Sequence, residues 1–508
     1  MINICIHGHF YQPPRENPWT GEIEKQDSAA PYHDWNERIY DECYKTNSKA
    51  EIIDDEGKVV SVFNNYETLN FNFGPNLLAW IKAKHPETYE KIIDADKKSI
   101  PLHNGHGNAI AMCYNHMIMP LANLNDKITQ VLWGLADFKH HFGRDSEGIW
   151  LPETACNPDT LEVLITLGVK YIILDTSQAA FYRRSGADKW IDVNDGSINP
   201  KRPYRCYSET QKNRYIDIFF YDGPVSKSVA FDDVLESSQN LLKKIFNAED
   251  KDSPGDQLIS VATDGETFGH HKKHAERTLA YFMRSLAPQN ELKIVNFGEY
   301  LELHPPQFEV KIKPGDNGEG TSWSCVHGVK RWNEDCGCGG GGGWVQQWRK
   351  PLRETMDWLR NQMIIIFENL GSLIFYDVWK ARNEYITLML DNSSENRAKF
   401  FKDNSHKQLS QNEEQTAVKL LEMQRYSMLM YTSCGWFFSE ISGLETVKIL
   451  EYAARAMEIV YELTGINVEN EFKKRLGEAK SNIPKYKTGK GVYEKLVLPH
   501  KHLEENQK

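Results

Sequence analysis

The 508-residue sequence contains no run of about 18 or more uncharged apolar residues, the length that a membrane-spanning helix needs. It also lacks an excess of basic residues, because 60 lysines and arginines stand against 71 aspartates and glutamates, for a net charge of −11. That balance argues against a nucleic-acid partner. The first residues, Met1 to Ile6, have the pattern of a buried strand and carry no basic leader.

Cysteine is scarce, with nine residues scattered along the chain. An odd number in a large chain fits a reducing compartment better than a disulfide framework. We therefore expect a cytoplasmic protein that binds neither nucleic acid nor membrane.

Apolar strand-like runs alternate with helical patterns up to about residue 300. Such alternation predicts an α/β fold, with a mostly parallel sheet that is covered by helices and closed as a barrel. Beyond it, residues 311–345 form a loop rich in glycine, cysteine and tryptophan, with five consecutive glycines at 339–343. From Pro351 the apolar spacing is helical, as in Leu352, Met356, Leu359 and Met363.

Two carboxylates each follow a buried strand directly. Glu153 comes after the run Gly148–Pro152, and Asp264 comes after Leu258–Thr263. Ligands of α/β proteins bind at the carboxyl ends of the strands, so we expect both acids at one rim, about 5 to 7 Å apart. Such a pair suits retaining glycoside hydrolysis, in which one carboxylate attacks the anomeric carbon and the other protonates the leaving oxygen. The alternative is that one or both cap helices or pair with a surface arginine.

Histidines form a second group of polar candidates. His7, His9 and Gln12 follow the first strand, where they could bind a metal or hydrogen-bond to a polar small molecule. We favour the small molecule, because no acidic residue accompanies the histidines. His116 is polar among apolar neighbours, and a core histidine and a substrate contact are equally consistent with that position.

Five stretches of the chain resemble, in order, the motifs of glycoside hydrolase family 57. They are His7 to Pro13, Cys113 to Leu121, Gly148 to Ala155, Asp264 to His271 and Ser433 to Phe438. The resemblance implies a distorted (β/α)7 barrel followed by an α-helical domain. We expect the barrel over residues 1–310, the loop 311–345 over the active site, and the helical domain, which contributes to the site, over 346–508. Phe10-Tyr11 interrupts the first motif, and the loop is unusual, which suggests a divergent subgroup whose substrate need not be starch.

By that resemblance the chain is a retaining glycoside hydrolase or transglycosylase that acts on α-linked glucans, similar to α-amylases, 4-α-glucanotransferases or branching enzymes. Glu153 would be the nucleophile and Asp264 the general acid/base, with no cofactor required. The sequence leaves hydrolysis versus transfer and a possible homo-oligomer open. The expected substrate-binding residues are His7, His9, Gln12, His116, Trp150, Asp175, His270 and Trp436.

The loop also offers a possible metal site. Cys325 and His327 stand one residue apart, as do Cys336 and Cys338. Four such ligands suit a tetrahedral Zn²⁺, although the gaps are tighter than usual, and loose thiols are the alternative. We expect any zinc there to fasten the loop and not to take part in catalysis.

Two other functions compete with this interpretation. A metal-dependent carbohydrate hydrolase or deacetylase would use the N-terminal histidines, but it needs an aspartate that the first motif lacks. A non-catalytic glycan-binding protein would have no need for both Glu153 and Asp264.

Overall fold

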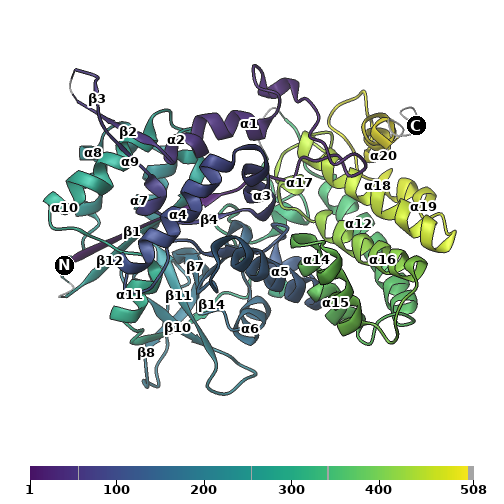
Figure 1. The fold of residues 1–508 in the computed structure, drawn as a ribbon. Helices are drawn as coiled ribbons and strands as arrows, with labels where there is room; N and C mark the ends of the chain where they lie inside the picture. Colours follow the sequence, from purple (N-terminus) through teal and green to yellow (C-terminus); the bar gives the residue numbers. More distant parts are fainter. Residues whose placement is uncertain (55, 253–254, 340–342, 502–508) are drawn as a thin grey trace. The chain divides into compact units, whose positions relative to one another are not determined.

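The computed structural model describes residues 1–54, 56–252, 255–339 and 343–501 (Figure 1). The middle of the glycine run, residues 340–342, lies outside the described part. The chain forms two compact units. Unit 1 comprises residues 1–12, 25–112 and 138–323, and unit 2 comprises 13–24, 113–137 and 324–508. The division that we expect along the sequence, at residues 310 and 345, stays a prediction, because these units collect segments that are far apart in the chain.

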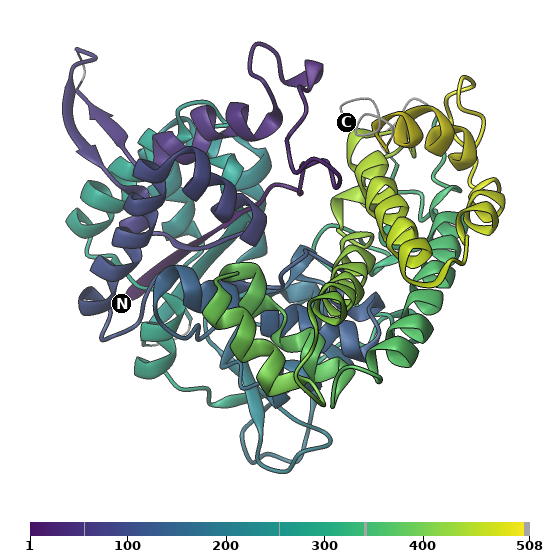
Figure 2. The same ribbon diagram turned by 45° about the vertical axis from the view of Figure 1, so that its right-hand side comes forward.

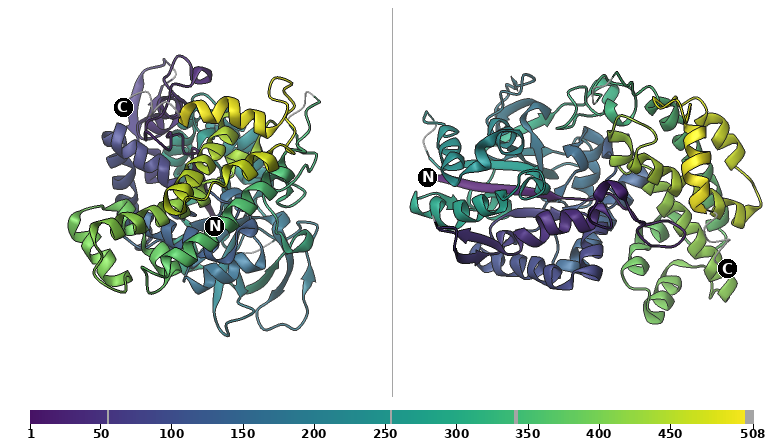
Figure 3. Two further views of the ribbon diagram at one scale, coloured as in Figure 1. Left: turned by 90° about the vertical axis from the view of Figure 1, so that its right-hand side faces the viewer. Right: turned by 90° about the horizontal axis from the view of Figure 1, so that it is seen from above.

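Strand β1 (Ile2–Phe10), which is buried along its whole length, lies at the centre of unit 1. It pairs in parallel with β12 (Gln257–Asp264), in a register that runs from Ile2 beside Gln257 to His9 beside Asp264. The right-hand view of Figure 3 shows β1 in purple, running from the N-terminus through unit 1. On its other side it pairs in parallel with β4 (Asn70–Phe73) and β13 (Lys293–Ile294). The register brings the carboxyl ends of β1 and β12 to the same level.

Further parallel contacts continue from β4. A bridge between Phe71 and Ala109 leads to β5 (Ala111–Met112), which pairs with β6 (Ile149–Trp150). A bridge between Gly148 and Tyr171 leads to β7 (Tyr171–Asp175), which pairs with β11 (Tyr215–Tyr221). The sheet then extends from β11 through β10 (Tyr204–Tyr207), β14 (Phe308–Ile312), β8 (Ala179–Arg184) and β9 (Ile191–Asp192). The hairpin β2 (Ala50–Ile53) and β3 (Val59–Phe63) stands apart.

Helices connect the strands of unit 1, and the predicted α/β fold is confirmed. Several begin with proline in the first turn, where its missing N–H costs nothing. In α6 the side chain of Asn157 also caps the helix, because its Oδ1 accepts a hydrogen bond from Thr160 N at 3.0 Å. The main helices are α3 (Pro75–Lys84), α4 (Pro86–Leu102), α6 (Pro158–Thr166), α7 (Gly223–Phe231), α8 (Ser238–Asn247), α9 (Ala275–Tyr281) and α11 (Phe297–Leu303).

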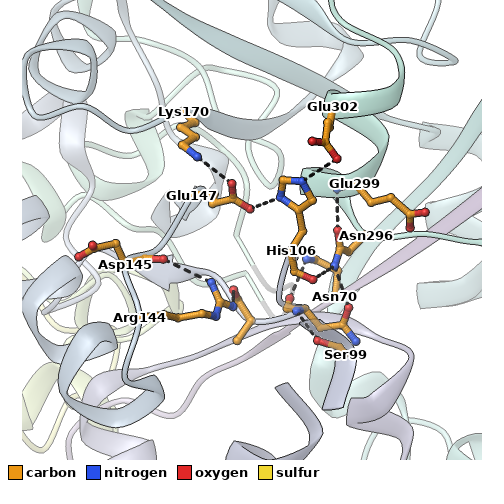
Figure 4. Close-up of polar contacts among 12 residues, drawn as sticks. Asn70, Ser99, His106, Arg144, Asp145, Glu147, Lys170, Asn296, Glu299 and Glu302 are labelled. Carbon is orange, nitrogen blue, oxygen red and sulfur yellow. Dashed lines mark hydrogen bonds and ion pairs between the residues drawn. The ribbon is translucent and has the colours of Figure 1, made fainter. Parts of the chain in front are cut away.

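A polar network occupies the amino ends of the parallel strands (Figure 4). His106 precedes β5, Glu147 precedes β6 and Lys170 precedes β7. Nδ1 of His106 lies 2.7 Å from a carboxylate oxygen of Glu147, whose other oxygen accepts a hydrogen bond from Lys170 at 2.8 Å. Asn296 donates to the carbonyl of His106 at 2.8 Å. In parallel-stranded folds this end serves stability, so a reactive site is expected at the opposite end.

Unit 2 is mainly helical, as predicted for the C-terminal part of the chain. The predicted apolar face of α12 (Arg349–Gly371) is confirmed, because its side chains at Leu352, Met356, Leu359 and Met363 are fully buried. Helices α16 (Gln411–Leu429) and α18 (Leu444–Thr464) run side by side (Figure 2). The other main helices are α13 (Val378–Glu384), α14 (Ile386–Leu390), α15 (Ser394–Asn404), α17 (Cys434–Phe437) and α19 (Glu469–Leu476).

A buried ion pair holds an earlier part of the chain in unit 2. Asp126, in the part of α5 (Leu124–Phe142) that belongs to this unit, accepts a hydrogen bond from Arg382 at 2.8 Å. Both side chains are almost completely buried. Trp133 donates from its indole to the carbonyl of Arg382 at 3.1 Å. None of the described helices combines the length and the apolar character that crossing a lipid bilayer requires.

Candidate active site

Glu153 lies in a strained turn directly after β6. The residue adopts φ 57° and ψ 21°, and Thr154 follows with φ 48°. Residues with a Cβ avoid this left-handed region at a cost of about 1 kcal/mol or more each, and such strain collects at functional sites. The turn is fixed from outside, because Gln178 donates to the carbonyl of Thr154 at 2.8 Å and accepts from its hydroxyl at 2.9 Å. The half-buried Glu153 carboxylate is therefore presented in one orientation.

Trp323 holds the Glu153 carboxylate directly. Its indole Nε1 donates to Oε2 of Glu153 at 3.1 Å, and its backbone N–H donates to the Glu153 carbonyl at 3.0 Å. The ring also packs edge-on against Trp150 and Tyr221, at centroid distances of 5.1 and 6.2 Å. A hydrogen bond to a carboxylate favours its ionised form. Sequence reasoning did not include Trp323 among the site residues, although the dense aromatics of its loop were a signal.

Asp264 is the last residue of β12 and the exposed member of an otherwise buried strand. Desolvation of its carboxyl group by the surrounding protein raises the pKa of Asp264 to about 7, and the negative charge of Glu153 adds to the rise. The two acids are therefore near enough for their charges to interact, and their expected separation of about 5 to 7 Å stays a prediction. Near pH 7 about half of the Asp264 carboxyl groups therefore carry a proton, beside the negative charge of Glu153.

The two histidines of β1 form an aromatic stack with Trp150. The ring of His7 lies 4.7 Å from Trp150 and that of His9 lies 5.1 Å from it, both nearly parallel. Burial lowers the pKa of His7 to about 4 and that of His9 to about 3, so both are neutral at neutral pH. His7 is fully buried, with ring nitrogens 2.6 Å from Asn70 Oδ1 and 3.1 Å from Asn72 Oδ1. Asn70 and Asn72 thus hold the His7 ring against Trp150, and His9 lies beside Asp264 in the paired strands.

Glu266 is a further acidic residue of the site that sequence reasoning missed. It is buried and its Oε1 accepts hydrogen bonds from Tyr44 OH at 2.6 Å and from Tyr11 N at 3.1 Å. Burial raises the pKa of Glu266 to about 8, against the lowering effect of the Tyr44 hydrogen bond, and the charge of Asp264 adds to the rise. Its place two residues after Asp264 was the available signal. Gln12 is also buried here and donates to the Tyr11 carbonyl at 3.0 Å.

Asp175 and His270 are held by protein partners. Asp175 caps the turn after β7 by accepting from Ser177 N at 2.8 Å, and its own N–H donates to Gln178 at 2.9 Å. It therefore positions the glutamine that fixes the Glu153 turn. His270 pairs with the carboxylate of Glu42. The expected sugar contacts of Asp175 and His270 stay predictions.

The structure brings the second and fifth motif-like stretches together within unit 2. Nδ1 of His116 lies 2.6 Å from the hydroxyl of Ser433, whose N–H donates to the His116 carbonyl at 2.9 Å. His116 also has a positive φ of 55°. Trp436 is almost completely buried, and its indole donates to the carbonyl of Met430 at 3.3 Å. Their expected sugar contacts stay predictions.

The chain is similar to known proteins over both parts. The family model described as "Glycosyl hydrolase family 57" matches residues 10–313, and a "Domain of unknown function (DUF3536)" matches residues 344–506. The α-amylase 1 of Dictyoglomus thermophilum is 24% identical over 265 residues, which are 50% of this chain and 34% of that protein. The 4-α-glucanotransferase of Thermococcus litoralis is 20% identical over 267 residues, 50% of this chain and 36% of that protein.

The chain thus spans about a third of the length of these curated relatives. Among solved structures, an exo-type maltose-forming amylase from Pyrococcus sp. ST04 is similar with a TM-score of 0.69 and 13% identity, over 100% of this chain and 94% of that one. At this identity the likeness concerns the fold, an α/β part together with a helical C-terminal region.

Proposed function

Because the chain belongs to glycosyl hydrolase family 57, we propose that it is a retaining glycoside hydrolase or transglycosylase that acts on α-linked glucans or related α-glucosides. Glu153 is the nucleophile and Asp264 the general acid/base. The observation that carries the proposal is the placement of the two acids, Glu153 in the turn after β6 and Asp264 at the end of β12, where desolvation and the charge of Glu153 raise the pKa of Asp264 to about 7. Retaining hydrolysis requires a carboxylate nucleophile beside an acid whose raised pKa lets it hold a proton.

The reaction proceeds in two displacements. Glu153 attacks the anomeric carbon while Asp264 donates its proton to the glycosidic oxygen, which leaves with the first product. Asp264, now ionised, then takes a proton from an incoming hydroxyl, which attacks the glycosyl-enzyme and releases Glu153. Water as the acceptor gives hydrolysis, and a sugar hydroxyl gives transfer. Both steps invert the anomeric carbon, so the configuration is retained.

The substrate-binding surface belongs to the same proposal. Neutral imidazoles and indoles present hydrogen-bonding edges and apolar faces, which suit the alternating polar and apolar surface of a sugar. The chemistry needs no cofactor. The proposed contacts are His9, Gln12, His116, Trp150, Asp175, His270 and Trp436, with His7 in support.

We also propose that the parallel strands of unit 1 close into a distorted (β/α)7 barrel, in the order β12, β1, β4, β5, β6, β7 and β11. The pairs and bridges along this series support it, as does the hydrogen bond from Asp222 N, just after β11, to the carbonyl of Ser260 in β12 at 2.8 Å. A cytoplasmic location is proposed too, because all nine cysteines are free thiols.

A metal-dependent deacetylase on a related barrel is the weaker candidate. The ring nitrogens of His7 face the side-chain amides of Asn70 and Asn72, whereas a catalytic zinc site would need a carboxylate or a third histidine there. Among the described residues, the histidine, cysteine and acidic side chains that gather closely enough to hold a metal are in the loop of unit 2, away from β1 in the sequence.

The test is product analysis by NMR with maltooligosaccharides. The protein is expected to release the α-anomer first, as shorter chains for a hydrolase or as a redistributed ladder for a transferase. Glu153→Gln and Asp264→Asn should each lower kcat by about a thousandfold or more, whereas the matched change Glu302→Gln, at the amino ends of the strands, should leave activity intact. A β-anomer as first product, or an active and folded Glu153→Gln variant, would refute the assignment.

A further inference from the structure

Four side chains that could bind a metal converge in the loop that follows Ser324, where the third segment of unit 2 begins. Sγ of Cys325 lies 3.8 Å from Sγ of Cys336, and Sγ of Cys338 lies 3.4 Å from Nδ1 of His327. All four ligand atoms lie within 4.8 Å of one another. The three sulfurs are free thiols, since a disulfide would bring two of them to about 2.05 Å.

The two shortest of these separations match the edges of a zinc tetrahedron. With Zn–S bonds of about 2.3 Å and Zn–N bonds of about 2.0 to 2.1 Å, two sulfurs lie about 3.8 Å apart, and a sulfur and a nitrogen about 3.5 Å apart. The observed edges of 3.8 and 3.4 Å agree with both. We propose that Cys325, His327, Cys336 and Cys338 together bind one structural Zn²⁺ ion.

The surroundings of the cluster suit the charge of such a site. Three thiolates and a neutral histidine around Zn²⁺ carry a net charge of −1. Arg349, fully buried at the start of α12, lies near enough to Cys336 and Cys325 for their charges to interact, and its Nη1 has no hydrogen-bond partner among the described residues. Arg349 also donates to the carbonyls of Trp436, Phe437 and Phe438 and lies near the charge of Asp335, and a zinc–thiolate cluster would add a second counter-charge. Arg331 also donates to the carbonyl of Cys338 at 3.2 Å.

The ion would fix a segment that has little regular structure of its own. Between the two ligand pairs lies a single short helical turn, Lys330–Trp332, whose Trp332 is fully buried. Trp332 packs 6.3 Å from Phe437 of α17 and lines a small cavity together with Trp436. The protein supplies all four ligands and leaves no coordination position for water or substrate, so the site fits a structural and not a catalytic ion.

The loop is also connected to the proposed active site along the chain. Cys325 follows Trp323, the donor to Glu153, by two residues. Anchoring Cys325 would limit the freedom of that tryptophan. The metal site itself stands independently of the proposed function, because it is tested by binding and not by turnover.

The metal content of the purified full-length protein tests the proposal. Mass spectrometry for metals should find one zinc per chain, and removal of zinc followed by addition of Co²⁺ should give the absorption bands of a tetrahedral cobalt–thiolate site. Cys336→Ser and Cys338→Ser should each lose the bound zinc, while the matched change Cys434→Ser, outside the cluster, should keep it.

Because a cysteine variant could fail to fold, the cobalt spectrum of the wild-type chain serves as the second readout. Wild-type protein without zinc and without a cobalt–thiolate spectrum would overturn the proposal, and so would a disulfide between Cys325 and Cys336 detected by intact mass. Zinc that persists in both the Cys336→Ser and Cys338→Ser variants would place the ion elsewhere and would equally overturn it.

Discussion

The pH dependence of turnover follows from the proton that Asp264 carries. Desolvation by the surrounding protein, together with the charge of Glu153, raises the pKa of Asp264 to about 7. A general acid acts only while protonated, so kcat/KM should fall as the pH rises through that value. At pH 8 about one tenth of the molecules keep the proton, and the rate should drop about tenfold for each further pH unit.

The assay is kcat/KM for a maltooligosaccharide between pH 5 and 10, with circular dichroism at each pH to confirm that the chain stays folded. Glu266 is the nearby acid with a pKa of about 8, so Glu266→Gln is the control variant. It should leave the midpoint of the basic limb near 7. A rate that stays flat through pH 9, or a limb that disappears in Glu266→Gln, would refute the assignment of Asp264 as the acid.

The contribution of Glu153 to the raised pKa of Asp264 can be tested separately. Glu153→Gln removes the negative charge that disfavours ionisation of Asp264, so NMR titration of labelled aspartates should find the pKa of Asp264 lower than in the wild type. An unchanged or higher value would mean that the two carboxyl groups do not share one cavity.

Three further predictions concern the groups that hold the site and the fold. Trp323→Phe keeps an aromatic ring but loses the donor to Glu153, so kcat/KM should fall by about tenfold or more, for a charged hydrogen bond of about 1.5 to 3 kcal/mol, with little change in Tm. Gln178→Ala leaves the turn at Thr154 without its two hydrogen bonds and should lower both activity and, by about 1 to 3 kcal/mol, the free energy of unfolding in urea; an unchanged kcat would contradict this. Arg382→Ala leaves the buried carboxylate of Asp126 without its cation and should lower the free energy of unfolding in urea by about 3 to 5 kcal/mol. A loss below about 1 kcal/mol would contradict this.

The local sequence pattern was sufficient to predict that both acids lie at or just after the carboxyl end of a strand. Asp264 is the last residue of β12 and Glu153 lies in the turn after β6, and the end of a strand is recognisable from the change from apolar to polar residues, as at Thr263 and Asp264. The apolar stripe of α12 is another local signal that the structure confirms. Parallel pairing then places strand ends at one edge without further information from the sequence.

Contacts between distant residues could not be predicted in this way. Asn70 and Asn72 contact the ring nitrogens of His7 from 63 and 65 positions away, which no local pattern predicts. Asp126 and Arg382 are 256 positions apart, and their ion pair attaches the first part of α5 to unit 2. Trp323 lies in a loop with no periodicity, where only the final packing determines which group its indole meets.

The covalent intermediate tests the central claim most directly. An activated fluorinated α-glucosyl donor, which forms the glycosyl-enzyme faster than it is hydrolysed, should leave one sugar on the chain, and peptide mass spectrometry should find it on Glu153. A label on a different residue, or turnover with retention while no label accumulates in either the wild type or Asp264→Asn, would contradict the assignment.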